Sequence, residues 1–312
     1  MLFNGRNRVE VIEDGNKKKV IKELVGTNEE ITRRIDNIKK WNDLLSLYLY
    51  KTNQNYEFEN QKITCDYVEG ENLQSLLFNN EINFSPDLII SITKMLEGIH
   101  NLKVGEKEDV VVDNLFSSIP LDLFEISSGG QIELLRLIHN DIDIQNYIKE
   151  NDRRITKNKC FVHGDVRLDQ FIVSDDGLAI IDFEEFGEGI PELDLANFWG
   201  SIIFSNLLKV FSLEVDKRDN ILSLNNKILI EGSRALDESF QWIKLSYNSY
   251  HNNRNLDIKL IHTRMCSFII GRLYSRSFLS AKLSPIDLAI AGITKELLVN
   301  FDELKGDLYG ND

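Results

Sequence analysis

The sequence has little of what marks membrane and secreted proteins. No apolar run among its 312 residues approaches the roughly 18 residues that a transmembrane helix needs. The first residues, MLFNGRNRVEV, lack the apolar core of a secretory signal. We therefore expect a cytoplasmic protein.

Cysteine and proline are scarce. The 3 cysteines, Cys65, Cys160 and Cys266, are widely spaced and odd in number, and the first two lie in apolar, strand-like surroundings. This pattern favours buried thiols in a reducing cytosol over disulfides or metal ligands. The 4 prolines and the lack of a low-complexity tract argue against a disordered linker, and 42% hydrophobic residues can build a large core.

Positive charge is also in deficit. The chain has 36 Lys and Arg against 50 Asp and Glu, a net charge of −14. This balance disfavours nucleic acid and anionic membranes as partners, because both repel an acidic surface. It is compatible with a small cationic partner.

The motifs that carry chemical groups are concentrated between Phe161 and Gly200. An HGD triplet comes first, and two apolar, strand-like runs follow, joined by a turn rich in Asp and Gly; the second run ends in IDFE. Such a hairpin brings Asp165 of HGD and Asp182 of IDFE to one end of a sheet. Metal-dependent phosphoryl transfer needs two such acids, one to accept a hydroxyl proton and one to hold Mg²⁺.

The order HGD, IDFE, Gly and Asp-Leu-Ala resembles the catalytic core of the aminoglycoside phosphotransferase and choline kinase family, a branch of the protein-kinase-like fold. The resemblance implies that Asp165 is the catalytic base and Asp182 the metal-binding acid. It also implies that Asp194 is a buried carboxylate bracing the catalytic loop. His163 would fix that loop by hydrogen bonds rather than take the proton.

One position departs from the family pattern. Where the family has Asn, this chain has Gln170, one methylene longer. Its amide oxygen still suits Mg²⁺, so we expect Gln170 to be the second metal ligand. The neighbouring Asp169 is the alternative ligand, and a chain that has lost metal binding is a third reading.

The N-terminal segment fits the resemblance. Arg8 to Glu13 and Lys19 to Leu24 alternate like two strands of a hairpin. By resemblance, Lys22 on the second strand grips the nucleotide phosphates. The nucleotide-covering loop would be Asn4 to Asn7.

A helix is predicted over residues 28 to 50, with Thr27 or Asn28 as its cap. Kinase-like folds pair the strand lysine with an acid on this helix. Glu29, Glu30 and Asp36 all remain candidates.

Lys62 to Gly70 reads as a strand that ends in a turn. By resemblance this is the hinge, where backbone groups of Asp66, Tyr67 and Val68 bind the adenine edge. Further helices are predicted after it, including one opened by Ser85 and Pro86. Residues 105 to 159 are predicted to be largely helical.

We therefore predict an α+β, two-lobed protein-kinase-like fold. Residues 1–68 form an N-lobe with a small antiparallel sheet and the hinge, and residues 69–312 form a mainly helical C-lobe with acceptor-binding insertions.

The predicted function is transfer of the γ-phosphate of ATP or GTP, with Mg²⁺, to a hydroxyl of a small cationic molecule. An aminoglycoside or similar antibiotic ranks first, which would make the protein a resistance or self-protection enzyme. A choline- or ethanolamine-type metabolite ranks second, and a nucleotide-binding pseudokinase regulator remains an alternative.

Overall fold

The computed structural model describes residues 7–15, 17–80, 85–111, 116, 121–151, 154–211, 221–250 and 256–310. The first three residues of the expected nucleotide-covering loop, 4–6, lie outside this range. The chain divides into two compact units. Unit 1 comprises Met1–Asn83, Ser91–Gly105 and Lys159–Asp194, and unit 2 comprises Phe84–Ile90, Glu106–Asn158 and Leu195–Asp312.

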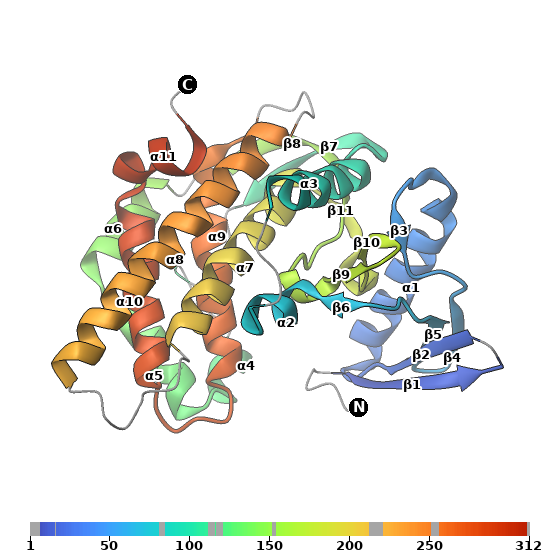
Figure 1. Cartoon of the computed structure of the whole chain (residues 1–312), viewed down its shortest axis with the longest axis horizontal. Coiled ribbons are helices and arrows are strands. Elements are labelled where there is room, and N and C mark those ends of the chain that lie inside the picture. The colour runs from blue at the N-terminus through green and yellow to red at the C-terminus, as the bar shows by residue number, and fades with distance from the viewer. Residues whose placement is uncertain are drawn as a thin grey trace. The chain divides into compact units, whose positions relative to one another are not determined.

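Unit 1 begins with an antiparallel sheet in the order β1-β2-β5-β4. Its strands are β1 (Arg8–Asp14), β2 (Lys17–Glu23), β4 (Glu57–Glu59) and β5 (Lys62–Asp66). Lys22 pairs across β2 with Val9 on one side and Ile63 on the other. A buried apolar cluster joins this sheet to the helix that follows it, and its members are Leu24, Ile31, Ile38 and Ile63. Figure 1 shows this helix, α1, beside the blue strands.

That helix, α1 (Asn28–Leu44), is shorter than predicted. It begins with a capping box, in which Thr27 and Glu30 exchange side-chain-to-backbone hydrogen bonds. It ends at Leu44, and a short 3₁₀ turn (Leu45–Leu47) leads to β3 (Lys51–Thr52). Leu49, which lies within the predicted helix 28 to 50, is 92% exposed. The chain leaves the helix there because β3 must pair in parallel with β10.

A second sheet carries the hairpin that the sequence predicts. Its order is β3-β10-β9-β6, with β6 at Glu71–Asn72, β9 at Phe171–Ser174 and β10 at Gly177–Ile180. β9 and β10 are antiparallel, and Phe171 lies opposite Ile180. The residues just before β9 and just after β10 therefore meet at one end of the sheet.

The prediction that residues 105–159 are largely helical is wrong at both ends. β7 (Lys103–Val111) and β8 (Arg154–Val162) are strands, which form a third sheet with β11 (Gly187–Gly189) in the order β11-β8-β7. Between them lie α4 (Leu121–Glu125), α5 (Gly129–His139) and α6 (Ile142–Asn151). The Ser-Ser-Gly-Gly segment is the boundary between α4 and α5, with Ser128 as the N-cap.

The remaining helices are α2 (Leu73–Phe78), α3 (Pro86–His100), α7 (Pro191–Phe211), α8 (Ile221–Ser249), α9 (Ile258–Arg276), α10 (Pro285–Val299) and α11 (Phe301–Tyr309). In unit 2, α9 packs along α10 and α11 packs on α8, as Figure 1 shows. Within the described residues, no helix is both long and apolar enough to cross a membrane.

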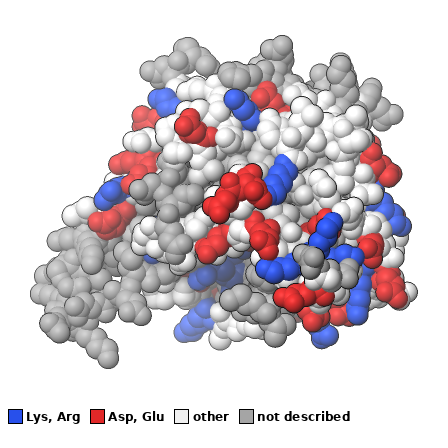
Figure 2. Space-filling model, turned by 45° about the vertical axis from the view of Figure 1, so that its right-hand side comes forward, with Lys and Arg blue, Asp and Glu red and all other residues white. Residues whose placement is uncertain are grey.

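Charged side chains of both signs lie next to one another on the face seen in Figure 2. Ion pairs in unit 1 include Lys18 with Glu69 and Lys19 with Glu57. Exposed pairs of this kind contribute little stability each, about 0–1 kcal/mol.

His262 on α9 is a fully buried histidine that ties two other helices together. Its Nε2–H donates to the carbonyl of Leu297 on α10 at 2.7 Å, and its Nδ1 lies 3.1 Å from the Tyr309 hydroxyl on α11. Burial lowers the pKa of His262 to about 4. The folded protein therefore holds this imidazole neutral.

This burial predicts acid sensitivity. The unfolded chain protonates His262 near pH 6.5, whereas the folded protein does so only near 4, so stability falls as the pH drops from 6.5 to 4. We expect roughly 2–3 kcal/mol of unfolding free energy to be lost at this residue between pH 7 and 4.5. Urea denaturation at both pH values should show a smaller loss in His262→Gln than in the wild type. An equal loss in both proteins would contradict the prediction.

Candidate active site

A buried carboxylate holds the HGD loop. Asp194, in the first turn of α7, is 0% exposed and accepts backbone N–H bonds from His163 at 2.7 Å and Gly164 at 2.9 Å. His100 Nε2 at the end of α3 lies 3.0 Å from the same carboxylate. The expectation that Asp194 braces the loop before Asp165 is confirmed by this geometry.

Position 164 in this loop accepts only glycine. Its φ is +87°, in the region that favours glycine, and an added Cβ would lie 2.2 Å from the carbonyl oxygen of Glu185. The loop therefore passes directly against the backbone of Glu185, the residue that follows IDFE. This close approach brings the HGD and IDFE motifs together.

The hairpin end is closed by hydrogen bonds around Ile181. Its backbone N–H donates to the Gln170 carbonyl at 3.0 Å, and its own carbonyl lies 2.9 Å from His163 Nε2. The next residue, Asp182, has left-handed backbone angles, φ 72° and ψ 62°. A non-glycine residue in this region is uncommon and is typical of functional sites, where surrounding contacts hold it. His163 thus fixes the loop by hydrogen bonding, as expected.

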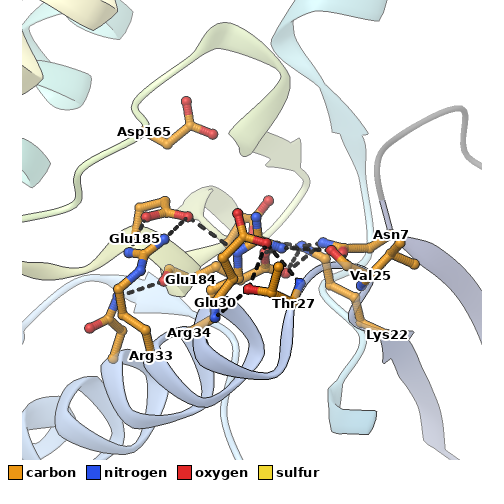
Figure 3. A network of polar contacts seen from close by, with 12 residues as sticks. Asn7, Lys22, Val25, Thr27, Glu30, Arg33, Arg34, Asp165, Glu184 and Glu185 are labelled. Atoms are coloured by element: carbon orange, nitrogen blue, oxygen red, sulfur yellow. Dashed lines mark hydrogen bonds and ion pairs between the residues drawn. The ribbon is translucent and has the colours of Figure 1, made fainter. Parts of the chain in front are cut away.

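Lys22 reaches this hairpin end from β2. Its Nζ lies 2.8 Å from Asp182 Oδ1 and also pairs with Glu184 Oε1. Asn7, just before β1, donates to both oxygens of Glu184 at 3.1 Å. Figure 3 shows Lys22, Asn7 and Glu184 converging, while Asp165 lies apart with its carboxylate directed away from them.

Helix α1 contributes basic and amide groups to the site rather than the expected acid. Arg34, which is buried, lies 3.9 Å from Glu184, and Asn37 donates to the Glu184 carbonyl at 2.8 Å. Of the candidate acids, Glu30 closes the capping box of α1 and Asp36 pairs with Lys39 at 3.7 Å. In the described part of the chain, the acids that pair with Lys22 come from IDFE.

Burial and charge set the ionisation of this cluster. Burial favours the neutral amine of Lys22, but Asp182 and Glu184 outweigh it and raise its pKa. Burial would raise the pKa of Asp182, yet the charge and hydrogen bond of Lys22, together with other nearby positive groups such as Arg167, outweigh burial and lower it. Burial and the neighbouring Asp182 raise the pKa of Glu184. Burial likewise raises the pKa of Asp165, although Arg167 opposes it. Asp182 therefore stays ionised, whereas the raised pKa of Asp165 makes it the better proton acceptor of the two.

The two candidate second ligands differ in their surroundings. Gln170 is 2% exposed, and its Oε1 has no hydrogen-bond partner among the described residues. Both oxygens of Asp169 instead accept bonds from Arg167, at 2.9 and 3.4 Å. No group of three His, Cys, Asp or Glu side chains in the described residues forms a metal cage. Mg²⁺ in phosphotransferases commonly uses one or two protein ligands plus phosphates, so the unpaired amide oxygen of Gln170 is a ligand of the type that it takes.

The expected hinge follows β5. Asp66 is engaged by the sheet, since its N–H donates to the Gln54 carbonyl at 2.9 Å and its carbonyl accepts from Asn53 at 3.0 Å. The Tyr67 N–H donates to the Lys18 carbonyl at 3.0 Å. The Val68 N–H has no hydrogen-bond partner in the described structure. Among the amides of Asp66, Tyr67 and Val68, this N–H is therefore the one without a hydrogen bond in the described structure.

Comparison with known proteins agrees with this geometry. Residues 121–216, which hold the HGD and IDFE motifs, match the sequence model of the phosphotransferase enzyme family. No curated protein sequence matches the chain. Among solved structures, choline kinase LicA from Streptococcus pneumoniae is 13% identical, with a TM-score of 0.51, over 96% of this chain and 93% of that one.

Two further structures have the same fold. Spectinomycin phosphotransferase APH(9)-Ia, in complex with ADP and spectinomycin, is 14% identical over 99% of this chain and 92% of that one, with a TM-score of 0.50. Glucosamine kinase, in complex with glucosamine, ADP and inorganic phosphate, is 13% identical over 98% and 83%, with a TM-score of 0.53. The chain has the kinase-like fold of these phosphotransferases. The resemblance expected from the sequence is confirmed.

The sequence did not indicate several residues of this candidate site. Glu184 pairs with Lys22, and Arg34 and Asn37 contact Glu184, but only Glu184 lies in a motif. The signal for Arg34 was its place beside the apolar positions of α1, where a charged residue is buried only if it is paired. Arg167 was visible as a cation two residues after the expected base.

The buried carboxylate of Asp194 yields a stability prediction. An amide at this position presents one acceptor to the two backbone N–H groups and His100, so Asp194→Asn should cost about 3 kcal/mol of unfolding free energy. Chemical denaturation measures this loss. Asp175→Asn, the same change in the exposed hairpin turn, is the control and should stay within about 0.5 kcal/mol of the wild type. Equal stability of the two variants would refute the bracing role.

Proposed function

We propose that this protein transfers the γ-phosphate of ATP or GTP to a hydroxyl of a small cationic molecule. The observation that carries the proposal is that Lys22 pairs with Asp182 at the end of the β9–β10 hairpin within unit 1, where the Gln170 carbonyl accepts from the Ile181 N–H and the Gln170 side chain donates to Asp165 at 3.5 Å. A base, a pair of oxygen ligands and a cation for phosphate are the parts that phosphoryl transfer requires.

Asp165 is the proposed base. It accepts the proton of the acceptor hydroxyl as the acceptor oxygen bonds to the γ-phosphorus. The bond from that phosphorus to the β,γ-bridging oxygen breaks, and the nucleoside diphosphate leaves with the electron pair. Lys22 grips the nucleotide phosphates, for which it exchanges part of its pairing with Asp182 and Glu184.

Gln170 and Asp182 would hold Mg²⁺. The buried, unpartnered Oε1 of Gln170 and the ionised carboxylate of Asp182 supply the hard oxygen ligands that this ion prefers. When bound, the ion would offset the negative charge of the phosphates. Both oxygens of Asp169 are held by Arg167, which supports Gln170 over Asp169 as the ligand.

The nucleotide base lies against Asp66, Tyr67 and Val68 in this proposal. The Val68 N–H and the Tyr67 carbonyl are the hinge groups best able to bind the edge of a purine, since the sheet already engages those of Asp66. Residues 1–68 would then cover the nucleotide, and residues 69–312 would carry the catalytic loop and the acceptor pocket.

The acceptor class rests on charge and on chemistry. The chain carries a net charge of −14, which suits a cationic substrate. Choline, spectinomycin and glucosamine, named in the three solved structures, each carry both a hydroxyl and a nitrogen. An aminoglycoside-like antibiotic is our first choice, in a cytoplasmic resistance or self-protection enzyme. The buried free thiols of Cys65, Cys160 and Cys266 support a reducing compartment.

The function is tested by nucleotide consumption. The purified protein, with Mg²⁺ and ATP or GTP, is screened against aminoglycosides, other hydroxylated antibiotics and amino-alcohols such as choline and ethanolamine. We expect acceptor-dependent release of nucleoside diphosphate. Asp165→Asn is the control, and loss of the base should lower turnover by about 10²–10⁴-fold while nucleotide binding survives. Near-wild-type turnover in this variant would reject Asp165 as the base, and nucleotide binding without transfer to any acceptor would indicate a pseudokinase.

The metal ligands are tested by nucleotide binding with Mg²⁺ and with a chelator. In calorimetry, Asp182→Ala should abolish the strengthening of binding by Mg²⁺. Gln170→Ala should reduce that strengthening roughly tenfold, and Gln170→Asn should retain most of it because the amide oxygen remains. Asp169→Ala should leave it unchanged. A severe Asp169→Ala beside a mild Gln170→Ala would transfer the role to Asp169.

A further inference from the structure

Arg167 joins two carboxylates of the catalytic loop. It lies two residues after Asp165, in extended backbone at the start of the 3₁₀ turn Leu168–Gln170. Its Nη1 donates to Asp165 Oδ2 at 2.5 Å, and its Nε and Nη2 donate to the two oxygens of Asp169. The Arg167 side chain is only 22% exposed. It is therefore packed into the loop instead of extending into solvent.

The geometry of the guanidinium makes this arrangement directional. Two roughly parallel hydrogen bonds to Asp169 fix the plane of the group, as bidentate Arg–carboxylate pairs do. Once the plane is fixed, the position of Nη1 is fixed as well, and with it the position of Asp165 Oδ2. Asp169 thus acts on Asp165 through Arg167.

The two oxygens of Asp165 are used differently. Both of its side-chain hydrogen bonds within the described residues end on Oδ2, one from Arg167 and a longer one of 3.5 Å from Gln170. Oδ1 has no hydrogen-bond partner in the described part of the chain. A base must keep one oxygen open toward the hydroxyl that it deprotonates.

We propose that Arg167, held in plane by Asp169, is a positioning residue that fixes Oδ2 of Asp165 and leaves Oδ1 facing the acceptor hydroxyl. The proposal rests on the function proposed above and adds to it two residues with stated roles. A carboxylate held by one oxygen keeps a single orientation, whereas a free carboxylate rotates and spends part of its time misaligned. Misplacement of a reacting group by about 1 Å can cost roughly 10²-fold in rate.

A purely structural role would have a different signature. Arg167 also offsets the repulsion between Asp165 and Asp169, so its loss could loosen the loop and lower stability without a specific effect on transfer. The positioning role predicts a loss in kcat, with the KM for the acceptor and the Kd for the nucleotide nearly unchanged. It also predicts that the effect of Asp169 disappears when Arg167 is absent.

The test measures kcat, acceptor KM, nucleotide Kd and melting temperature for Arg167→Gln, Arg167→Lys, Asp169→Asn and the Arg167→Gln/Asp169→Asn double variant. We expect Arg167→Gln to lower kcat by roughly 10–100-fold, with KM and Kd within about threefold of the wild type. Arg167→Lys should recover part of kcat, since it restores the charge but not the bidentate plane. Asp169→Asn should lower kcat by about tenfold alone and by little in the Arg167→Gln background.

Several outcomes would overturn the proposal. These are a kcat of Arg167→Gln within threefold of the wild type, a loss confined to KM or Kd, a kcat loss explained by unfolding at the assay temperature, and fully additive effects of the two substitutions. A wild type that transfers phosphate while the Arg167 variants remain fully active removes this inference and keeps the proposed function. A wild type that transfers to no acceptor in the panel removes both.

Discussion

The carboxylate of Asp194 is the contact on which the candidate site depends. It is fully buried, and it accepts the backbone N–H groups of His163 and Gly164 directly before Asp165. Burial alone would raise its pKa, but the hydrogen bond and charge of His100, with the loop amides, lower it. A buried charge without such partners would be strongly unfavourable. The HGD loop therefore has one conformation in which this anion is satisfied, and that conformation presents Asp165.

Around this anchor the site is arranged by opposite charges from distant parts of the chain. Lys22 from the first sheet meets Asp182 and Glu184 from the hairpin end, and Arg34 from α1 approaches Glu184 from the other side. The ring of Trp41 on α1 stacks on the ring of Phe183, with 3.8 Å between the ring centroids. This apolar contact also holds α1 against the IDFE motif. Glu184 needs several partners because it is a buried carboxylate beside a second one. The acid that accompanies Lys22 thus comes from the IDFE motif and not from the helix.

A second set of contacts holds Asp165, the proposed base. Oδ2 of Asp165 accepts a hydrogen bond from Arg167, and Arg167 in turn donates to Asp169. Alternating charges along this short loop let three ionised side chains lie close together without net repulsion. Asp169 and Gln170 differ in the same region, because Arg167 occupies both oxygens of Asp169. The amide oxygen of Gln170 is instead buried and has no hydrogen-bond partner among the described residues. In the proposed function, one of these neighbouring residues would act on the base and the other would bind the metal.

The sequence by itself determined the parts of this protein that local patterns encode. The hairpin of β9 and β10, the cap at Thr27 and the first strands were predictable, because turn residues, capping side chains and strand alternation act over a few positions. The kinase-like fold was predictable only from the resemblance of the segment with HGD, IDFE and Asp-Leu-Ala to a known family. The sequence did not determine where α1 ends, since Leu45 to Leu49 are compatible with a helix and only the pairing of β3 with β10 ends it. It also mispredicted β7 and β8, whose partners lie far along the chain. Only the tertiary structure decided that Lys22 pairs with Glu184, that Arg34 is buried beside it, and that Arg167 spans Asp165 and Asp169. Ion pairs at buried sites depend on which distant elements meet, and no pattern within one segment records that choice.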